Sequence, residues 1–459
     1  MTLTIYIIPL LIGYFIVRLW QNKVKFFFLE KLALGFGLGT LVITFIIFIL
    51  SFFGFRFSQS NILILSAGLL IVSLVISYFF QPFRISLQIR NLPIRIFQNK
   101  SKIISHIFLL ILILIIIFKI GYVFAEAYLR PIIQFDAVAN WSLRARVFFF
   151  QERIPIHPQE PYWLGAGGHE NYPLHLPLLE LWASKILGQW HEPTLEMISP
   201  FYYLSLLIIF YFTLSHLIGK KLAIIFTFFL ATLPFLNYHA FAAYADLPLS
   251  FYLTAAVILC FLGLKKNNGA YFSLAILFCF GAAWIKNEGL FLSLIILFCL
   301  TIYLLIKKQL KSYLRLISLW LIFFILLLPW LIFMAYHHLG FSNIGARPSP
   351  ASGPMVFGFY PRALSFIWAS LLLESGWHIL WLVLILTLIS WPKSFFNKFN
   401  LFLGLNVFGS LFFYFALYLF TSANFEYLKM GMILNRNLLT VVPLVLFYLG
   451  LIFSENFNK

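Results

Sequence analysis

Charged residues are scarce in this sequence. Asp, Glu, Lys and Arg make up 10% of its 459 residues, against about 25% in an ordinary soluble domain. Only three cysteines are present, Cys260, Cys279 and Cys299, and all lie inside apolar segments. This excludes a disulfide framework and gives no support to a cysteine metal site. Hydrophobic residues make up 62% of the chain, and apolar runs long enough to cross a bilayer recur throughout, which excludes a water-soluble or disordered protein.

Acidic residues are fewer than basic ones, 14 against 32, so the formal net charge is +18. In a soluble protein this excess would point to nucleic acid. Here most Lys and Arg residues flank apolar segments, so membrane topology explains them and we expect no nucleic-acid partner. Because no basic stretch precedes the first apolar run, we also expect no cleaved signal peptide.

The apolar pattern predicts an all-α polytopic membrane protein with about 13 transmembrane helices. They are expected to begin near Thr4, Leu32, Asn61, Ile103, Met197, Leu222, Leu247, Ala270, Leu290, Leu316, Ala363, Leu401 and Leu439. When alternate connections are assigned to opposite faces, about 20 of the 32 basic residues fall on one face and about 11 on the other. The positive-inside rule makes the richer face cytoplasmic. We therefore expect a multi-pass protein of the plasma or inner membrane, with its N-terminus outside and its C-terminus in the cytoplasm.

The two faces were assigned from Lys and Arg alone, yet the acidic residues are also distributed unequally between them. Only Glu30 and Glu455 fall on the cytoplasmic side, and the other 12 of 14 fall on or near the outer side. If the protein catalyses a reaction, the outer face is the one with enough carboxylates to do it.

The longest polar connection spans about residues 124–196 and contains two helix-like stretches. In the first, residues 135–149, helical spacing aligns Asp136, Asn140 and Arg144 on one face. This pattern predicts a helix in the membrane interface with its polar side toward water, and it favours Arg144 as a partner of Asp136. The second stretch, residues 172–182, follows a flexible glycine-rich segment, so the two together predict an interfacial platform.

Three further outer turns carry ionisable groups: residues 237–248 with Asp246, residues 284–289 with Lys286 and Glu288, and residues 435–437 with Arg436. A run of alternating glycines at residues 35–39 looks like a nucleotide-binding loop. It lies inside an expected membrane helix with no preceding strand, so we interpret it as a site of close helix packing.

These segments together resemble the GT-C superfamily of polytopic glycosyltransferases, above all the group containing the dolichyl-phosphate-mannose–protein mannosyltransferases and the bacterial lipid A aminoarabinose transferases. The resemblance rests on Phe135-Asp136-Ala137 with Trp141 and Arg144, on residues 171–179, on Tyr244-Ala245-Asp246-Leu247-Pro248, on Lys286-Asn287-Glu288-Gly289, and on Arg436 with Pro443. It covers about Ile103 to Phe453. It implies a GT-C-like domain at residues 101–459, its outer catalytic loop at about 124–196, preceded by a three-helix extension at residues 1–100. Ala137 stands where the mannosyltransferases have a second acidic residue, which disfavours a protein acceptor.

The resemblance implies a glycosyltransferase that moves a sugar from a polyprenyl-phosphate donor to an envelope lipid, glycan or protein on the outer face, with inversion. Asp136 would be the general base, and Arg436 and Lys286 would bind the phosphate. The remaining candidates for substrate binding are Arg144, Tyr172, His175, Asp246 and Glu288. His169 and Glu170 leave a divalent metal ion open, and no other cofactor is expected. The partners are the donor, the acceptor and membrane lipids.

Each of these residues also has an ordinary structural interpretation. Asp136 and Asp246 both stand where a helix N-cap would be expected. Glu288 and Lys286 are close enough in sequence for a local salt bridge, and Arg436 at a helix end could simply reach lipid phosphates. The sequence leaves these alternatives open.

Two other functions compete with the glycosyltransferase. A lipid-linked oligosaccharide polymerase or ligase shares the donor type, but its largest outer loop usually comes late in the chain. A polytopic transporter or flippase would need ionisable residues deep in several helices. Lys119 and Glu374 are its main candidates, and both can lie near the outer surface.

Overall fold

The computed structural model describes residues 4–81, 100–165, 170–307, 313–340, 357–397, 399–431 and 433–457. Within these ranges the chain is helical, and its one β-type pairing is an isolated bridge between Phe357 and Thr421. The helices are α1 (Ile7–Arg18), α2 (Phe28–Ser51), α3 (Gln59–Phe80), α4 (Lys100–Leu129), α5 (Ser142–Gln151), α6 (His175–Leu187), α7 (Glu192–Glu196), α8 (Ile198–Ile218), α9 (Lys220–Thr232), α10 (Pro234–Phe241), α11 (Asp246–Lys266), α12 (Gly269–Ile285), α13 (Asn287–Ile306), α14 (Tyr313–Tyr336), α15 (Ala363–Leu372), α16 (Leu380–Ser390), α17 (Pro392–Phe395), α18 (Asn400–Phe420), α19 (Ser422–Lys429), α20 (Leu434–Leu438) and α21 (Val442–Phe457).

Membrane-spanning helices dominate the structure, which confirms an all-α polytopic fold. In the described part of the chain, eight helices are long and apolar enough to cross a bilayer, or nine if α9 and α10 form one broken span. Five further apolar helices are shorter, so the number thirteen is not confirmed. The span expected to begin near Ala363 is two short helices, α15 and α16. The polar Glu374-Ser375-Gly376 segment interrupts its apolar run, and a 3-10 turn at Ser375–Trp377 joins the pieces.

The span expected to begin near Leu222 is also interrupted. Helices α9 and α10 are bent by 65° relative to each other. Pro234, the first residue of α10, has no backbone N–H and disfavours helical geometry in the residue before it, and Leu233 indeed adopts ψ 122°. The bend leaves α10 as a short helix directly before the turn that leads into Asp246.

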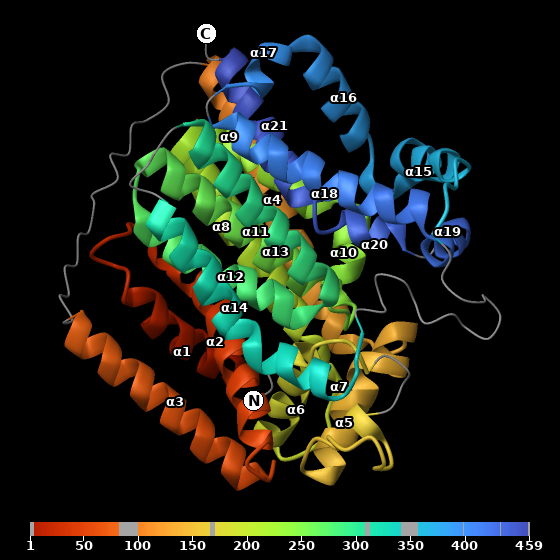
Figure 1. Cartoon of the computed structure of the whole chain (residues 1–459). Helices are drawn as coiled ribbons and strands as arrows, with labels where there is room; N and C mark the ends of the chain where they lie inside the picture. Colours follow the sequence, from red (N-terminus) through yellow and green to blue (C-terminus); the bar gives the residue numbers. More distant parts are fainter. Residues whose placement is uncertain are drawn as a thin grey trace.

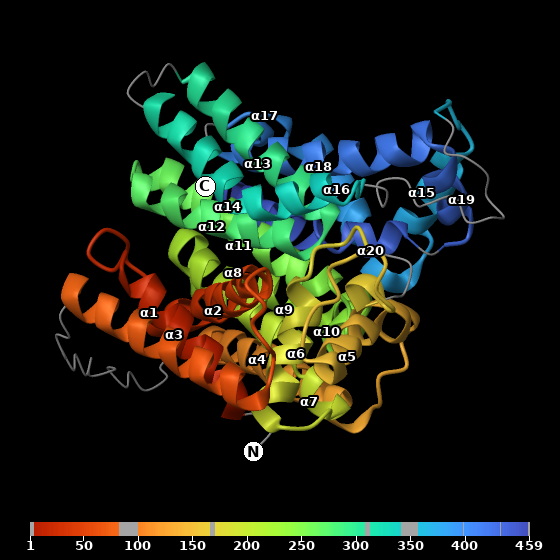
Figure 2. The same ribbon diagram turned by 60° about the horizontal axis from the view of Figure 1, so that its bottom comes forward.

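The spanning helices form a bundle in which α5, α6 and α7 lie together at one end (Figure 1). The N-terminus lies at that end and the C-terminus at the opposite end. Figures 1 and 2 agree that α1 to α3 and the pair α15 and α19 occupy opposite sides of the bundle. We call the group α5, α6 and α7 the platform, and it corresponds to the interfacial helices expected in the outer loop.

Helix α2 is held tightly between its neighbours by the glycine run of residues 35–39. A Cβ atom on Gly39 would lie 1.7 Å from the Pro9 carbonyl oxygen of α1, and one on Gly37 would lie 2.5 Å from the Phe251 ring of α11. The predicted packing role is therefore confirmed, because no larger residue fits at either position. As a result α2 is largely buried and contacts α1, α6, α8 and α12.

Candidate active site

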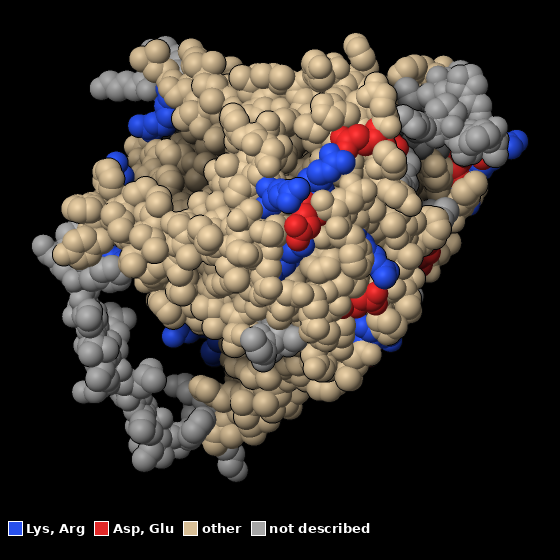
Figure 3. All heavy atoms as spheres, turned by 90° about the horizontal axis from the view of Figure 1, so that it is seen from below, with Lys and Arg blue, Asp and Glu red and all other residues tan. Residues whose placement is uncertain are grey.

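Five charged side chains from four distant segments meet beside the platform. Asp136 lies at the start of the π-helical turn Ala137–Trp141, Asp246 begins α11, Lys286 and Glu288 flank the α12–α13 junction, and Arg436 belongs to α20. Each forms a salt bridge with at least one of the others. We call these five residues the charged cluster. Figure 3 views this end of the bundle, where acidic and basic side chains lie side by side on a largely uncharged face.

Asp246 is the buried centre of the cluster. Its Oδ1 accepts a hydrogen bond from Lys286 Nζ at 3.0 Å, and its Oδ2 accepts from Arg436 Nη2 at 2.8 Å and Nε at 3.3 Å. The N-cap position of α11 is Ala245 and Asp246 is the first residue inside the helix, so the N-cap interpretation does not describe it. A buried carboxylate is stable in its charged form only when cations and hydrogen bonds compensate it, and here two cations do so.

The two cations respond to this environment. Burial alone would lower the pKa of Lys286, but the carboxylates of Asp246 and Glu288 outweigh it and raise that pKa above its usual value. Burial would likewise lower the pKa of Arg436, and Asp246 and Asp136 raise it instead. Both side chains are therefore positively charged across the accessible pH range.

Asp136 occupies the open side of the cluster. Its Oδ2 lies 2.6 Å from Arg436 Nη1, and 32% of its side chain stays exposed, whereas 2% of the Asp246 side chain does. It makes no helix-capping hydrogen bond. Arg436 thus presents one edge to a buried carboxylate and another to an exposed one. Asp136 is the carboxylate that a substrate could reach.

Aromatic rings cover the cations. The guanidinium of Arg436 lies 4.8 Å from the ring centre of Tyr244, and Lys286 Nζ lies 5.7 Å from that of Tyr172. Cation–π contacts of this kind stabilise partly desolvated charge. Burial, followed by the charge of Asp136, raises the pKa of Tyr244 to about 12, and burial also raises the pKa of Tyr172. Both rings stay neutral. Tyr172, predicted to bind substrate, therefore lies beside the cluster.

Arg144 does not have the environment that the sequence suggested. It is fully buried, and it donates from Nε to the Leu164 carbonyl at 2.8 Å and from Nη1 to the Tyr172 carbonyl at 3.2 Å. The prediction of a water-facing polar side was wrong, and so was Arg144 as the partner of Asp136, which pairs with Arg436. The reason is the π-helical turn at Ala137–Trp141, because its wider winding rotates Arg144 away from Asp136. Arg144 instead holds two loop carbonyls in place, and burial lowers its pKa to about 9.

His175 is fully buried at the start of α6. Its Nδ1 lies 2.8 Å from the Thr44 hydroxyl and its Nε2 lies 3.0 Å from the Tyr202 hydroxyl. Burial lowers its pKa to about 3, so the ring is neutral. The structure thus links His175 to α2 and α8 through hydrogen bonds.

The two metal candidates are placed differently. His169 lies outside the described residues. Glu170 is described, and its charge acts on the guanidinium of Arg144. Among the residues that the structure describes, no group of three or more His, Cys, Asp or Glu side chains is arranged to hold a metal ion.

Comparison with known proteins gives a fold and little else. No known protein-family profile matches the sequence, and none of the curated proteins matches it. Among solved structures, the fold is similar to the crystal structure of ArnT from Cupriavidus metallidurans in the apo state, with a TM-score of 0.53 and 12% sequence identity over 77% of this chain. This chain has the membrane fold of ArnT.

The matched region spans 60% of the ArnT chain, so the likeness concerns the membrane fold and not the whole of that protein. The lipid A aminoarabinose transferases belong to the group that the sequence motifs resemble, and the likeness to ArnT agrees with that expectation at the level of the fold. In this chain the fold brings together Asp136, Asp246, Lys286, Glu288 and Arg436, which the sequence separates by up to three hundred residues.

Two residues near the cluster were not predicted as site residues. Tyr244 covers Arg436 as described, and His239 of α10 is buried with Nδ1 3.9 Å from Asp246 Oδ2. Both lie in the 237–248 turn, where Asp246 alone was predicted as a site residue. Pro234 is the sequence signal that could have pointed to His239. A proline at this position predicts a bend in the span, and the bent second half, α10, carries His239 toward Asp246.

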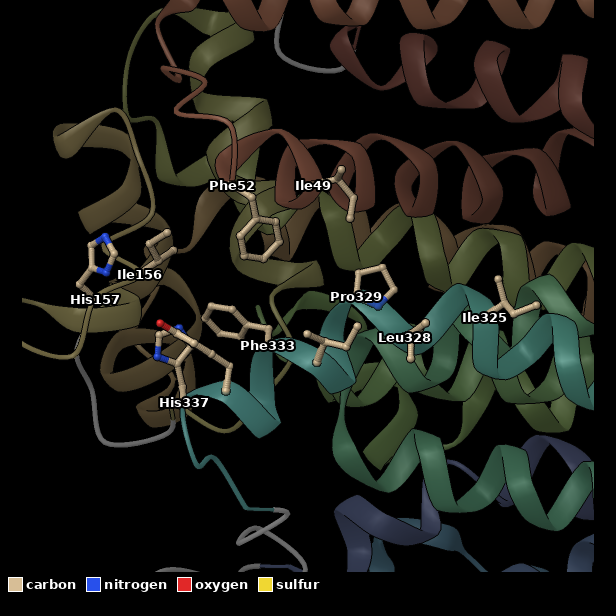
Figure 4. A pocket seen from close by; sticks show the side chains of 11 residues that line it. Ile49, Phe52, Ile156, His157, Ile325, Leu328, Pro329, Phe333 and His337 are labelled. Carbon is tan, nitrogen blue, oxygen red and sulfur yellow. The ribbon is translucent and has the colours of Figure 1, made fainter.

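An apolar groove of about 530 Å³ lies between α2 and α14, near the platform. Its walls are mainly aliphatic and aromatic, and Figure 4 shows His157 and His337 at one end and Ile325 at the other. A series of aromatic rings leads from the groove toward the segment that carries Lys286. Phe333 of the groove lies 5.8 Å from Phe48, and Phe48 lies 4.9 Å from Trp284, which precedes Lys286 by two residues.

Proposed function

We propose that this protein is an integral membrane glycosyltransferase that moves a sugar from a polyprenyl-phosphate donor to an envelope lipid, glycan or protein on the outer face. The observation that carries the proposal is the convergence of the charged cluster on the open Asp136 carboxylate. A partly exposed carboxylate beside two fixed cations offers both a base and a phosphate site, which this reaction requires. The likeness of the fold to ArnT, together with the GT-C resemblance of the sequence motifs, supports the same class of reaction.

In the proposed reaction, the acceptor hydroxyl attacks the anomeric carbon of the donor while the bond from that carbon to the phosphate oxygen breaks. Asp136 takes the proton of the hydroxyl, and the polyprenyl phosphate leaves with the bonding electron pair. A single displacement of this kind inverts the anomeric configuration. The negative charge that develops on the phosphate requires a fixed cation nearby.

Arg436 is the proposed phosphate ligand. Asp246 holds one edge of its guanidinium in the buried interior by two hydrogen bonds, so the group stays in place. The edge that faces Asp136 is the accessible one, and a phosphate that binds there would displace Asp136 and release it as a base. Lys286, held by Asp246 and Glu288, adds a second positive charge.

The apolar groove between α2 and α14 is proposed to hold the isoprenoid chain of the donor. Its lining matches a hydrocarbon, and it lies between two helices that are long and apolar enough to span the bilayer. The exposed side chains of α14 beside it, including Ile325 and Ile332, leave it open toward lipid. A chain entering from the bilayer would need no passage through water.

The proposed orientation places the cluster outside, the N-terminus outside and the C-terminus in the cytoplasm. The distribution of basic residues supports it, and so do termini at opposite ends of the bundle (Figure 1). Protease protection of tags at the two termini in intact cells tests it, and a protected N-terminal tag would contradict it.

The decisive experiment is mass spectrometry of envelope lipids and glycans from a deletion strain complemented with variants. We expect one glycosylated product to be missing, to return with the wild type and to stay missing with Asp136→Asn. Glu160→Gln is the matched control, because Glu160 is an outer carboxylate paired with Arg153 outside the cluster. An unchanged glycan profile in the deletion strain would contradict the proposed function. A product restored by Asp136→Asn would remove Asp136 as the base.

A further inference from the structure

Two threonines of α2 connect the N-terminal helices to the segments that carry the charged cluster. Thr44 Oγ1 accepts a hydrogen bond from Trp284 Nε1 at 3.2 Å, and Trp284 precedes Lys286 by two residues. The same oxygen lies 2.8 Å from His175 Nδ1, and His175 follows Tyr172 by three residues. One hydroxyl therefore touches both the segment of Lys286 and the segment of the ring that covers it.

The hydrogen-bonded chain continues from His175 to the helix that begins with Asp246. His175 Nε2 lies 3.0 Å from the Tyr202 hydroxyl, which lies 2.7 Å from Thr40 Oγ1. Thr40 Oγ1 in turn lies 3.2 Å from the hydroxyl of Tyr252 on α11, and that hydroxyl donates to the Gly37 carbonyl at 2.6 Å. The chain thus joins α2 to α6, α8, α11 and α12.

These side chains take all their hydrogen bonds from protein atoms. The Thr40 and Thr44 hydroxyls also donate to carbonyls of their own helix, Thr40 to Phe36 and Gly37 and Thr44 to Thr40 and Leu41, so their oxygens face the neighbouring helices as acceptors. Thr40, Thr44, His175, Tyr202 and Trp284 are each at most 1% exposed, so solvent does not reach them. Each donor and acceptor fixes its neighbour, because an unpaired polar group in such an environment is costly. The Phe251 ring of α11 packs directly against Gly37 of α2, next to this chain of hydrogen bonds.

We propose that Thr44 is a positioning residue for the active site, and that its hydroxyl sets Lys286 and Tyr172 in the geometry required to bind the donor phosphate. This inference rests on the proposed function and adds to it a role for the N-terminal helices. Thr44 touches no residue of the charged cluster, so it acts through Trp284 and His175. The N-terminal helices are then part of the active-site structure, and not an addition to it.

The informative variant is Thr44→Val, which keeps the shape of the side chain and removes its hydroxyl. Trp284 and His175 lose their shared partner, and we expect the α12–α13 junction to become less well fixed. Thr44→Ser keeps the hydroxyl and should restore the wild-type behaviour. Thr301→Val is the matched control, since Thr301 of α13 also accepts an indole N–H, from Trp320 at 3.3 Å, about 20 Å along α13 from Glu288.

The first measurement needs no substrate. Full-length protein in lipid nanodiscs is treated with a membrane-impermeant amine-acylating reagent, and the labelling rates of Lys286 and Lys185 are read by mass spectrometry. Lys286 is protected because it is buried and paired with two carboxylates, and Lys185 is a buried lysine of α6 paired with Glu152. We expect Thr44→Val to raise labelling of Lys286 at least fivefold, with Lys185, Thr44→Ser and Thr301→Val unchanged.

The second measurement is binding of undecaprenyl phosphate to the same proteins. We expect Thr44→Val to weaken it at least tenfold, with Thr44→Ser within twofold of the wild type. Unchanged Lys286 labelling in Thr44→Val, or equal increases at Lys286 and Lys185, would overturn the positioning role. If the wild type does not bind undecaprenyl phosphate, the proposed function is contradicted. The labelling result would still decide the role of Thr44.

If Thr44→Val does not yield folded protein, Tyr202→Phe gives an independent test. It removes one hydroxyl from the same chain, next to His175, and keeps the buried ring. We expect a smaller rise in Lys286 labelling than in Thr44→Val, about twofold or more. A rate equal to the wild type would overturn the proposal.

Discussion

The charged cluster and the platform both contain buried carboxylates at the same end of the bundle, but they hold them in different ways. In the cluster, Asp246 lies between Lys286 and Arg436. In the platform, Glu180 and Glu196 are buried, and neither forms a salt bridge within the described part of the chain. Burial, with Glu196 and Glu192 adding to it, raises the pKa of Glu180 to about 8, so this side chain is mainly neutral at pH 7.

The difference teaches that an acidic residue on the outer face is not by itself a sign of chemistry. A carboxylate beside cations keeps its charge when it is buried, and it can orient a base or a phosphate ligand. A carboxylate without cations takes up a proton and acts as a polar packing residue. Lys185 of the platform is also buried and pairs with Glu152, but that carboxylate is 42% exposed. In the cluster the carboxylate of Asp246 is itself buried and is shared by two cations.

Asp246→Asn should produce the largest effect. It leaves the buried Lys286 and the half-buried Arg436 without their shared buried carboxylate, and breaking a buried ion pair costs about 3–5 kcal/mol. We expect the free energy of unfolding to fall by this amount, with loss of donor binding. Thermal unfolding in detergent measures it. A midpoint within about 2 °C of the wild type would show that the cluster does not depend on Asp246.

Glu180→Gln should stabilise the protein, and more at high pH than at low pH. The folded-state pKa of Glu180 is raised above its unfolded value, so between about pH 4.5 and 8 the folded state holds a proton that the unfolded state has lost. Stability therefore falls as pH rises through this window. We expect Gln, which cannot ionise, to add roughly 1–3 kcal/mol at pH 8 and little at pH 5.

Unfolding measured at both pH values checks this prediction. Glu160→Gln serves as the control, because Glu160 is paired with Arg153 and belongs to neither the platform helices nor the cluster. Equal stability of Glu180→Gln and the wild type at pH 8 would mean that Glu180 is not a neutral packing residue.

Arg436→Lys should have an intermediate effect. Lysine keeps the charge, but a single ammonium cannot replace the planar guanidinium that faces Asp246 on one side and Asp136 on the other. We expect undecaprenyl phosphate affinity to fall by about 10- to 100-fold, corresponding to about 1.4–2.8 kcal/mol. Arg130→Lys is the matched control, since Arg130 is an exposed outer arginine paired with Glu126. Equal affinities in both variants would remove Arg436 from the phosphate site.

Asp136→Asn should have the smallest effect on stability, although it is expected to abolish transfer. Its salt bridge with Arg436 is partly exposed, and such pairs contribute about 0–1 kcal/mol. Unfolding measurements on Asp136→Asn and Asp246→Asn side by side test the contrast between the two carboxylates. If the two variants lose the same free energy of unfolding, the proposed difference between a partly exposed Asp136 and a buried, structural Asp246 is wrong.

Hydropathy predicted the fold well because each spanning helix is a local run of apolar residues that can be found from composition alone. The exceptions are positions where a single residue changes the path of the chain, as at Pro234, or where the backbone changes its winding, as at Ala137–Trp141. The second exception misplaced Arg144, since one extra residue per turn rotates everything that follows it. Such a change has no signal in hydropathy or charge.

For the site, sequence motifs named all five members of the charged cluster, because charged residues at helix ends in a membrane protein are few. They did not reveal which residues pair. The Asp246–Arg436 contact joins residues 190 positions apart, and only the packing of α11 against the end of the chain creates it. Thr44 could not be found from the sequence either, because a threonine inside an apolar helix usually bonds only to its own backbone.

Arg436 pairs with both Asp246 and Asp136, and this has a consequence for turnover. With no donor present, the guanidinium already carries an internal counter-ion, Asp136, in the place proposed for the phosphate. In the proposed reaction an incoming carrier lipid must compete with that carboxylate. After transfer, Asp136 must first release the proton that it took from the acceptor, and the restored carboxylate can then return to Arg436 and expel the spent carrier. Such a site favours moderate affinity and rapid release, which suits the proposed exchange of a loaded and an empty carrier that share a phosphate.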